Sequence, residues 1–199
     1  VEEVAEAAQH EDEDEEQRDE IDHLRRRDVE GRLERLERVV QDAIEKDPRL
    51  IELILQESNE VLRVRKGVIV VEHKLGFVCA NAGIDHSNVA GDGDSAEEFV
   101  LLLPEDPDRS CAMLRNEIES KTGKHIGVVI IDSHGRAWRN GTVGVAIGMS
   151  GVPGIIDKRG DKDLFGYTLK ITIIGAADEL AAAASLVMGQ ASEGRPVVH

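Results

Sequence analysis

The sequence predicts an α+β protein with a mixed, mainly antiparallel sheet and flanking helices. After residue 60, short β-branched runs bounded by glycine and proline outnumber the segments with helical periodicity. No repeat of fixed period runs along the 199 residues. Apolar residues make up 41% of the chain but aromatic residues only 3%, so we expect a core of Val, Ile, Leu and Ala.

The first 28 residues are mostly Glu, Asp, Gln and Arg, which predicts a solvated tail that is flexible, or helical towards its end. We expect the folded domain to occupy residues 29–199. It opens with an expected amphipathic helix, whose apolar residues at helical spacing are Val29, Leu33, Leu36, Val40 and Ile44. The apolar face of this helix packs on the core or forms a dimer contact, and both alternatives stay open.

Prolines and glycines mark the ends of three further helices. Asp47 is expected to cap a short helix that has proline at its first position. A second helix follows Asp106 and Pro107 and ends at Gly123. A third covers 176–188 and is closed by Gly189.

β-branched and apolar runs predict the strands. Residues 68–71 and 77–79 form a hairpin, and the run 100–103, stopped by Pro104, is a buried strand. We expect a strand buried on both faces at 126–131 and further strands at 143–149 and 169–174.

The chain has 40 acidic and 24 basic residues and a net charge of -16, which argues against nucleic-acid or anionic-membrane partners. Because 16 of the 24 basic residues are arginine and acidic groups crowd even the loops, we expect a salt-adapted, halophilic cytosol. No apolar run approaches the roughly 18 residues that span a bilayer, so a cytoplasmic location is expected. The chain opens at Val1 rather than Met, so we also expect residues upstream.

Polar clusters at 81–88 and 132–141 are expected where strands end. If Asp85 and Asp132 approach to about 4 Å, their repulsion is about 4 kcal/mol at an effective dielectric constant near 20. A divalent cation such as Mg²⁺ or Mn²⁺ would offset it. Alternatively each carboxylate caps a turn, Asp85 at the amides of Ser87 or Asn88 and Asp132 near residue 135.

Three other polar stretches also allow two interpretations each. Arg136 and Arg139 suit phosphate or carboxylate recognition, with surface solvation as the alternative. The mixed-charge stretch 157–166 is a solvated loop or a second functional loop. After the last helix, free amides with Ser192 and Arg195 could line a phosphate site.

Several other patterns carry no function. Residues 91–96 match a dinucleotide fingerprint only in letters, and no P-loop is present. Cys79 and Cys111 are expected to be buried thiols, and no arrangement of side chains suggests a covalent nucleophile. His86 and His134 are expected to be neighbours of the site rather than zinc ligands.

Five motifs in order, CANAGIDHSNV (79–89), LPEDPD (103–108), DSHGRAWRNG (132–141), DKDLFG (161–166) and AADELAAAA (176–184), resemble the coenzyme F(420)-0:gamma-glutamyl ligase family. The resemblance covers about residues 47–198. It implies a GTP-dependent ligase that joins L-glutamate to F(420)-0 through an acyl phosphate and then adds a further gamma-linked glutamate. It also implies an intertwined homodimer on an α+β fold.

The resemblance also implies site residues. Asp85 and Asp132 would bind one Mg²⁺ or Mn²⁺ ion, Ser133 a second, with Gln190 near the second, and K⁺ is a further candidate ion. We infer that Arg136, Arg139 and Asn140 orient phosphate or carboxylate groups during catalysis. The residues expected to contact GTP are Asn88, Met188, Gly189, Gln190, Ala191, Ser192, Glu193, Gly194 and Arg195.

The chain departs from the family pattern at several positions. Ser133 stands where threonine is expected, Gln190 stands where an acidic residue is common, and the loop at 90–98 is expected to be enlarged. A Ser-Lys-bearing strand near the N-terminus, which the family uses to bind GTP, is not found, and the acidic tail occupies its place. Two alternatives therefore stay open: a metal-dependent nucleotide hydrolase or phosphatase, and a catalytically incomplete deazaflavin-binding or dimerisation module.

Overall fold

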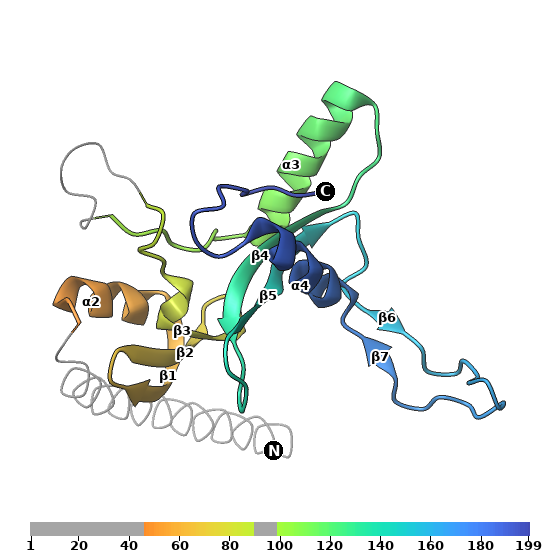
Figure 1. The fold of residues 1–199 in the computed structure, drawn as a ribbon, viewed down its shortest axis with the longest axis horizontal. Coiled ribbons are helices and arrows are strands. Elements are labelled where there is room, and N and C mark those ends of the chain that lie inside the picture. The colour runs from red at the N-terminus through yellow and green to blue at the C-terminus, as the bar shows by residue number, and fades with distance from the viewer. Residues whose placement is uncertain (1–45, 90–98) are drawn as a thin grey trace, which may run out of the picture. The chain divides into compact units, whose positions relative to one another are not determined.

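The structure, a computed structural model, describes residues 46–89 and 99–199 (Figure 1). The chain divides into two compact units, one up to Val78 and one from Cys79 onward. The predicted acidic tail, the amphipathic helix that follows it and the loop at 90–98 lie outside the described residues. Within the described residues, no helix is long and apolar enough to cross a membrane.

In the first unit, helix α2 (Pro48–Gln56) begins as predicted, because Asp47 Oδ1 accepts a hydrogen bond from Arg49 N at 2.8 Å. Strands β1 (Ser58–Arg65) and β2 (Val68–His73) form an antiparallel pair. The buried side chains that make the small core are those of Ile51, Ile54, Ile69 and Val71.

The predicted hairpin at residues 68–79 is confirmed. The chain turns at Gly76, whose φ of 86° suits glycine, and enters β3 (Val78–Ala80), the third strand of this sheet. His73 N donates to Phe77 O at 2.8 Å within the turn, and the two rings stack with centroids 5.3 Å apart.

The second unit is built around one long hairpin, β4 (Val128–Gly135) and β5 (Thr142–Ser150), which pair antiparallel. All strand pairs whose registers are described are antiparallel, which confirms the α+β class. The described strands fall into three small sheets, so the single sheet expected from the sequence is wrong. The other elements of this unit are η1 (Asn81–Gly83), α3 (Pro107–Thr122), β6 (Ile156–Asp157), β7 (Ile173–Ile174) and α4 (Ala176–Met188).

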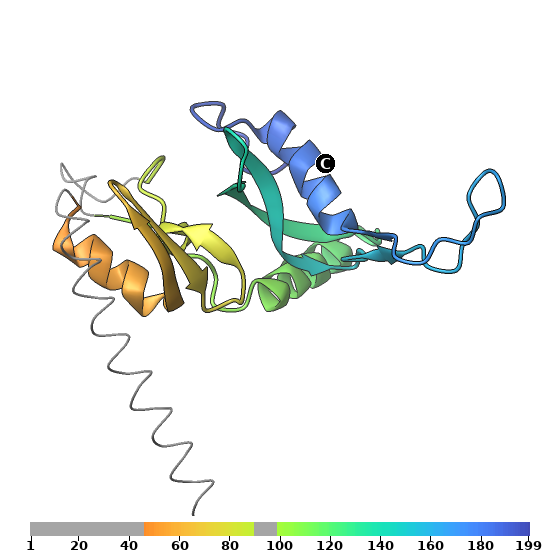
Figure 2. The same ribbon diagram turned by 90° about the horizontal axis from the view of Figure 1, so that it is seen from below.

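Helices α3 and α4 lie on either side of the β4–β5 ribbon (Figure 2), and two glycines of β5 allow that close approach. A Cβ on Gly144 would come within 2.5 Å of Ala181 O in α4, and one on Gly148 within 2.5 Å of the carbonyl carbon of Pro107 in α3. The helices also cap the strand's amides. Asp178 Oδ1 accepts from Ala146 N at 2.9 Å, and Asp108 Oδ1 accepts from Met149 N at 2.7 Å.

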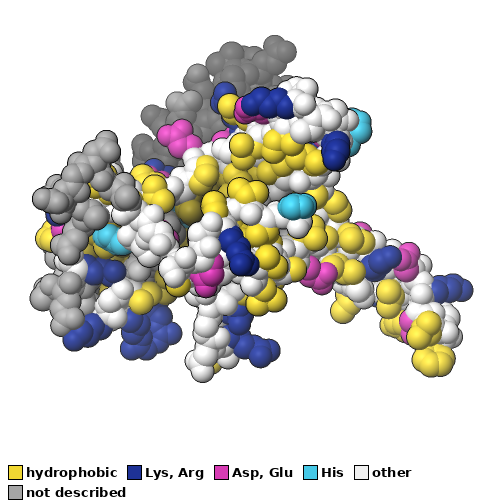
Figure 3. Space-filling view, turned by 45° about the horizontal axis from the view of Figure 1, so that its top comes forward, with side chains coloured by type: hydrophobic (Ala, Val, Ile, Leu, Met, Phe, Trp, Pro, Cys, Tyr) yellow, Lys and Arg dark blue, Asp and Glu magenta, His cyan; other side chains and the backbone are white. Residues whose placement is uncertain are grey.

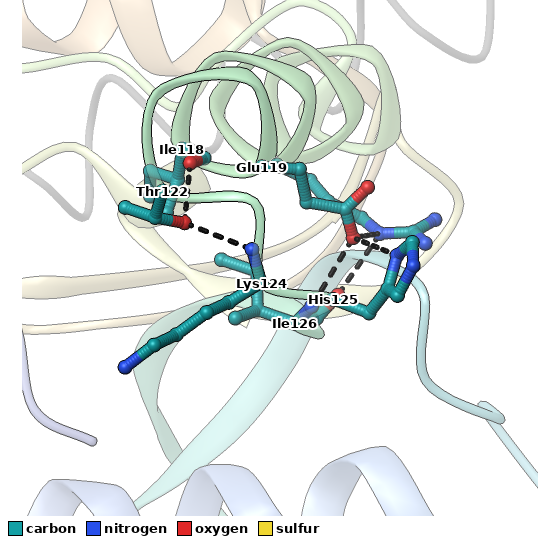
Figure 4. A network of polar contacts seen from close by, with 7 residues as sticks. Ile118, Glu119, Thr122, Lys124, His125 and Ile126 are labelled. Atoms are coloured by element: carbon teal, nitrogen blue, oxygen red, sulfur yellow. Dashed lines mark hydrogen bonds and ion pairs between the residues drawn. The ribbon is translucent and has the colours of Figure 1, made fainter.

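Helix α3 begins at the Asp106 cap and ends at Gly123, as predicted. Its last turns are tied to the start of β4 by Glu119 (Figure 4). Glu119 Oε1 accepts from Arg115 Nε at 3.0 Å and from Ile126 N at 3.1 Å. The Ile126 amide first, and the Arg115 charge after it, hold the pKa of Glu119 below its usual value.

Three strand predictions need correction. Residues 100–103 form no strand and only a single bridge joins Leu101 to Asp85; Leu101 and Leu102 are exposed, while Leu103 packs over Gly83. The strand expected at 126–131 starts at 128, continues to 135, and is half-buried rather than buried. Only 173–174 of the segment 169–174 are strand. The strand at 143–149 and the helix at 176–188 are confirmed.

Residues 155–174 form an arm that extends from the second unit through the short β6–β7 pair (Figure 1). Its outer part carries apolar side chains in solvent beside charged ones (Figure 3). Leu164 is 97% exposed, Phe165 95% and Ile171 88%. Four charged residues of 157–166 form ion pairs, Arg159 with Asp157 at 2.6 Å and Lys158 with Asp161 at 3.0 Å, which fits the solvated-loop interpretation of that stretch.

Candidate functional site

Strand β4 carries three polar residues in a row, Asp132, Ser133 and His134. They were expected beyond the end of the strand, but the pairing with β5 continues to Gly135 opposite Thr142, so they lie inside the ladder. Alternation along the strand explains their burial: Asp132 is half-buried and His134 buried on one face, while Ser133 is exposed on the other.

The Asp132 carboxylate lies near His134 and Cys79. His134 Nε2 is 3.1 Å from Asp132 Oδ2. Cys79 is buried, as predicted, and burial first and the Asp132 charge second raise the pKa of its thiol to about 11. A thiol with that pKa stays protonated at neutral pH.

Two contacts join β4 and the polar cluster near Asp85 to the loop after α4. Ser133 Oγ donates to Gln190 Oε1 at 2.8 Å, across 57 residues of sequence. Asn88, which has a φ of 55°, donates from Nδ2 to Ala191 O at 3.0 Å, across 103 residues. Ser133 and Gln190, both expected at a second metal, are thus hydrogen-bonded to each other. Asn88 and Ala191, both expected to contact GTP, are hydrogen-bonded as well.

The loop after α4 starts at Gly189, whose φ is 80°. Glu193 folds back over this loop, and its Oε2 accepts from Ala191 N at 2.8 Å. Hydrogen bonds from the amides of Ala191 and then of Glu193 itself lower the pKa of that carboxyl. Arg195 Nη1 donates to Val187 O at 3.4 Å, while Ser192 and Gly194 are exposed. The resemblance gave Glu193 a contact with GTP and did not anticipate its contact with the loop amides.

Asp85 makes the turn-cap contacts that the sequence left open as an alternative. Its Oδ1 accepts from Ser87 N at 2.8 Å and from Ser87 Oγ at 2.7 Å, and its backbone forms the bridge to Leu101. The convergence of Asp85 with Asp132 stays a prediction. His86 is exposed beside this turn.

Arg136, Arg139 and Asn140 lie in the loop that connects β4 to β5, and all three are exposed. The loop closes with a hydrogen bond of 3.3 Å from Arg139 N to Arg136 O, and Trp138 within it has a φ of 61°. The role of these residues in orienting substrate stays a prediction.

The donor set fits a hard divalent cation. Within the described ranges, no group of three or more His, Cys, Asp or Glu is placed to hold a metal. The candidate ligands instead combine the carboxylates of Asp85 and Asp132 with the hydroxyl of Ser133 and the amide oxygen of Gln190, all of which Mg²⁺ and Mn²⁺ accept. Neighbouring oxygens around octahedral Mg²⁺ lie about 3 Å apart, and the 2.8 Å between Ser133 Oγ and Gln190 Oε1 is compatible with that spacing.

Fold and site together define an antiparallel α+β protein with an oxygen-rich polar site built by β4, the loop after α4 and the turn at 85–88. Residues 28–199 match the family model described as F420-0:Gamma-glutamyl ligase. The chain is 52% identical over 153 residues to the coenzyme F420:L-glutamate ligase of Methanopyrus kandleri and 49% identical to that of Methanocaldococcus jannaschii; 77% of this chain is covered in both. The ligase of Archaeoglobus fulgidus is 44% identical over 179 residues, covering 85% of this chain and 69% of its own length.

The chain therefore belongs to the F420-0:gamma-glutamyl ligase family. It spans 58% of the Methanopyrus kandleri protein and 59% of the Methanocaldococcus jannaschii protein.

Proposed function

We propose that this chain carries the metal- and GTP-binding part of a ligase that joins L-glutamate to F420-0 and then adds a further gamma-linked glutamate. Membership of the family supports the choice of substrates. One observation carries the assignment to these residues: the loop after α4 is hydrogen-bonded at two neighbouring positions, Gln190 with Ser133 and Ala191 with Asn88. Polar contacts bring distant parts of the sequence together there.

In this proposal Asp85 and Asp132 hold one divalent cation, and Ser133 and Gln190 contribute to a second. Bound cations would neutralise the charge that develops as the γ-phosphoryl group of GTP moves to the substrate carboxylate. Asn88 and the loop from Met188 to Arg195 hold the nucleotide. His134 Nε2, 3.1 Å from Asp132 Oδ2, would be an outer partner of this carboxylate.

The exposed arginines of the β4–β5 loop suit the next part of the reaction. The substrate carboxylate, the acyl phosphate made from it and the incoming glutamate are all anionic. Guanidinium groups bind such anions through paired N–H donors. Arg136 and Arg139, with Asn140 beside them, are placed at the end of β4 that follows Asp132, where they would orient these anions.

Asp132→Asn tests the assignment. The amide keeps the size of the side chain but loses the charge, so glutamylation of F420-0 with GTP and Mn²⁺ is expected to fall about 100-fold or more. Glu179→Gln, which removes an exposed charge on α4, serves as the control. Near-normal turnover of Asp132→Asn at saturating Mn²⁺ would contradict the metal role. GTP hydrolysis that ignores F420-0 and glutamate would instead favour a nucleotide hydrolase.

We also propose that the protein acts as a homodimer and that the arm at 155–174 enters the contact between the two copies. A two-stranded hairpin is at best marginally stable in water by itself, and this one leaves Leu164, Phe165 and Ile171 almost fully exposed. A second copy that covers these side chains would supply the missing apolar burial. Sedimentation velocity measures the expected doubling of mass.

A further inference from the structure

The loop after α4 is held from within by a charged side chain. Glu193 Oε2 accepts from Ala191 N at 2.8 Å. The same side chain covers Gly189 so closely that a Cβ there would lie 2.5 Å from Glu193 Oε2 and closer still to Cδ. Gly189 also has a φ of 80°, which side chains rarely adopt. Glycine at 189 and glutamate at 193 therefore belong to one local structure.

The same loop is also hydrogen-bonded to other parts of the chain, at Gln190 and Ala191. Gln190 accepts from Ser133, and Ala191 O accepts from Asn88. Ala191 is thus fixed on both sides, its N–H by Glu193 and its carbonyl by Asn88. We therefore expect a change in the Glu193 contact to alter the direction in which Gln190 and Ala191 face Ser133 and Asn88.

The negative charge of Glu193 makes it an unsuitable partner for phosphate. A carboxylate within a few ångströms of a triphosphate repels it when no cation lies between them. A direct contact with the phosphates of GTP, without the cation proposed between them and Asp85 or Asp132, therefore conflicts with its chemistry, whereas holding the loop agrees with it.

We propose that Glu193 is a positioning residue: its carboxylate holds the loop from Gly189 in the shape in which Gln190 and Ala191 meet Ser133 and Asn88, and so prepares the nucleotide site. The inference rests on the proposed GTP-binding function of this loop. In this inference Glu193 maintains the conformation of the loop and does not contact GTP.

Binding of a slowly hydrolysed GTP analogue with Mn²⁺, measured by calorimetry, tests the inference. Glu193→Ala removes the acceptor and is expected to weaken binding roughly 10-fold to 100-fold, because hydrogen bonds to charged groups contribute on that scale. Glu193→Gln keeps one acceptor oxygen and is expected to lose less. Gly189→Ala is expected to resemble Glu193→Ala, because its new Cβ displaces the Glu193 side chain. Glu179→Ala and Glu179→Gln, at the exposed other end of α4, are the matched controls.

Steady-state kinetics separate positioning from a purely structural role. The inference expects the KM for GTP to rise in Glu193→Ala while kcat and the thermal midpoint change little. A lower midpoint and a lower kcat with an unchanged KM for GTP would overturn it, as would tighter GTP binding by Glu193→Gln, which would mark Glu193 as a competitor of phosphate. Unaltered binding by Glu193→Ala would overturn the inference and leave the proposed function standing. Failure of the wild-type chain to bind the analogue would instead count against the proposed function.

Discussion

The second unit contains two hairpins that differ in almost everything except the antiparallel direction of their strands. The β4–β5 pair runs from Val128 to Ser150, whereas β6 and β7 pair at only two residues each. Helices cover the first hairpin on both sides and cap its amides with Asp108 and Asp178. The second extends into solvent with apolar side chains exposed.

The comparison shows that backbone pairing alone does not decide how firmly a hairpin is held. Net stabilisation by a hydrogen bond is small because the unfolded chain bonds to water, whereas apolar burial and close packing add up along an element. Three polar residues of the candidate site, Asp132, Ser133 and His134, lie on the packed hairpin. Among residues 46–89 and 99–199 the arm has no such support, which is why we propose that a second copy covers it.

The largest effect on stability is expected from Gly148→Ala in the packed hairpin. The new Cβ would meet the backbone of Pro107 at 2.5 Å, and backbone yields less readily than a flexible side chain. We expect a loss of about 1–3 kcal/mol in the free energy of unfolding, measured by urea titration. The control is Gly135→Ala, on the same hairpin, where a Cβ meets nothing within 4 Å. Equal effects of the two substitutions would contradict the role of close helix packing.

Glu119→Gln is expected to weaken the link between α3 and β4 in a pH-dependent manner. The folded pKa of Glu119 is lowered from 4.5, so its contribution is fully present above that unfolded value and is lost as pH falls through the folded pKa. The difference in free energy of unfolding between wild type and variant should therefore be largest above about pH 5 and shrink below pH 4.5. Urea titrations between pH 3.5 and 7 measure it.

Glu117→Gln provides the matched control on the same helix. Glu117 is exposed and pairs with Lys121 one turn later, an arrangement that contributes little. A difference between wild type and Glu119→Gln that stayed constant across the pH range would show that the charge of Glu119 does not support this junction.

The smallest effect on the unfolding of a single chain is expected from Leu164→Ser on the arm. The side chain is 97% exposed, so its removal costs the chain little buried area and the change should stay within about 0.5 kcal/mol. In sedimentation velocity, however, the dimer is expected to dissociate at a higher protein concentration than in the wild type. A large loss of chain stability, or unchanged association, would contradict the proposed role of the arm.

The sequence by itself determined the features that depend on neighbouring residues. Asp47 with Pro48 and Asp106 with Pro107 start helices where expected, and Gly123 and Gly189 end them, because caps and φ preferences act within one turn of chain. The α+β class was also available from the periodicity of the segments, and the family resemblance from the order of the motifs.

Only the tertiary structure decided the features that depend on distant partners. The apolar run at 100–103 is no strand, because among the described residues its backbone pairs only at Leu101, through an isolated bridge to Asp85. Asp132 lies inside β4 because β5 extends the ladder to Gly135. Two hydrogen bonds, from Ser133 to Gln190 and from the Ala191 amide to Glu193, leave no periodic signal in the sequence. Side-chain contacts of this kind depend on how the elements pack and not on local preference.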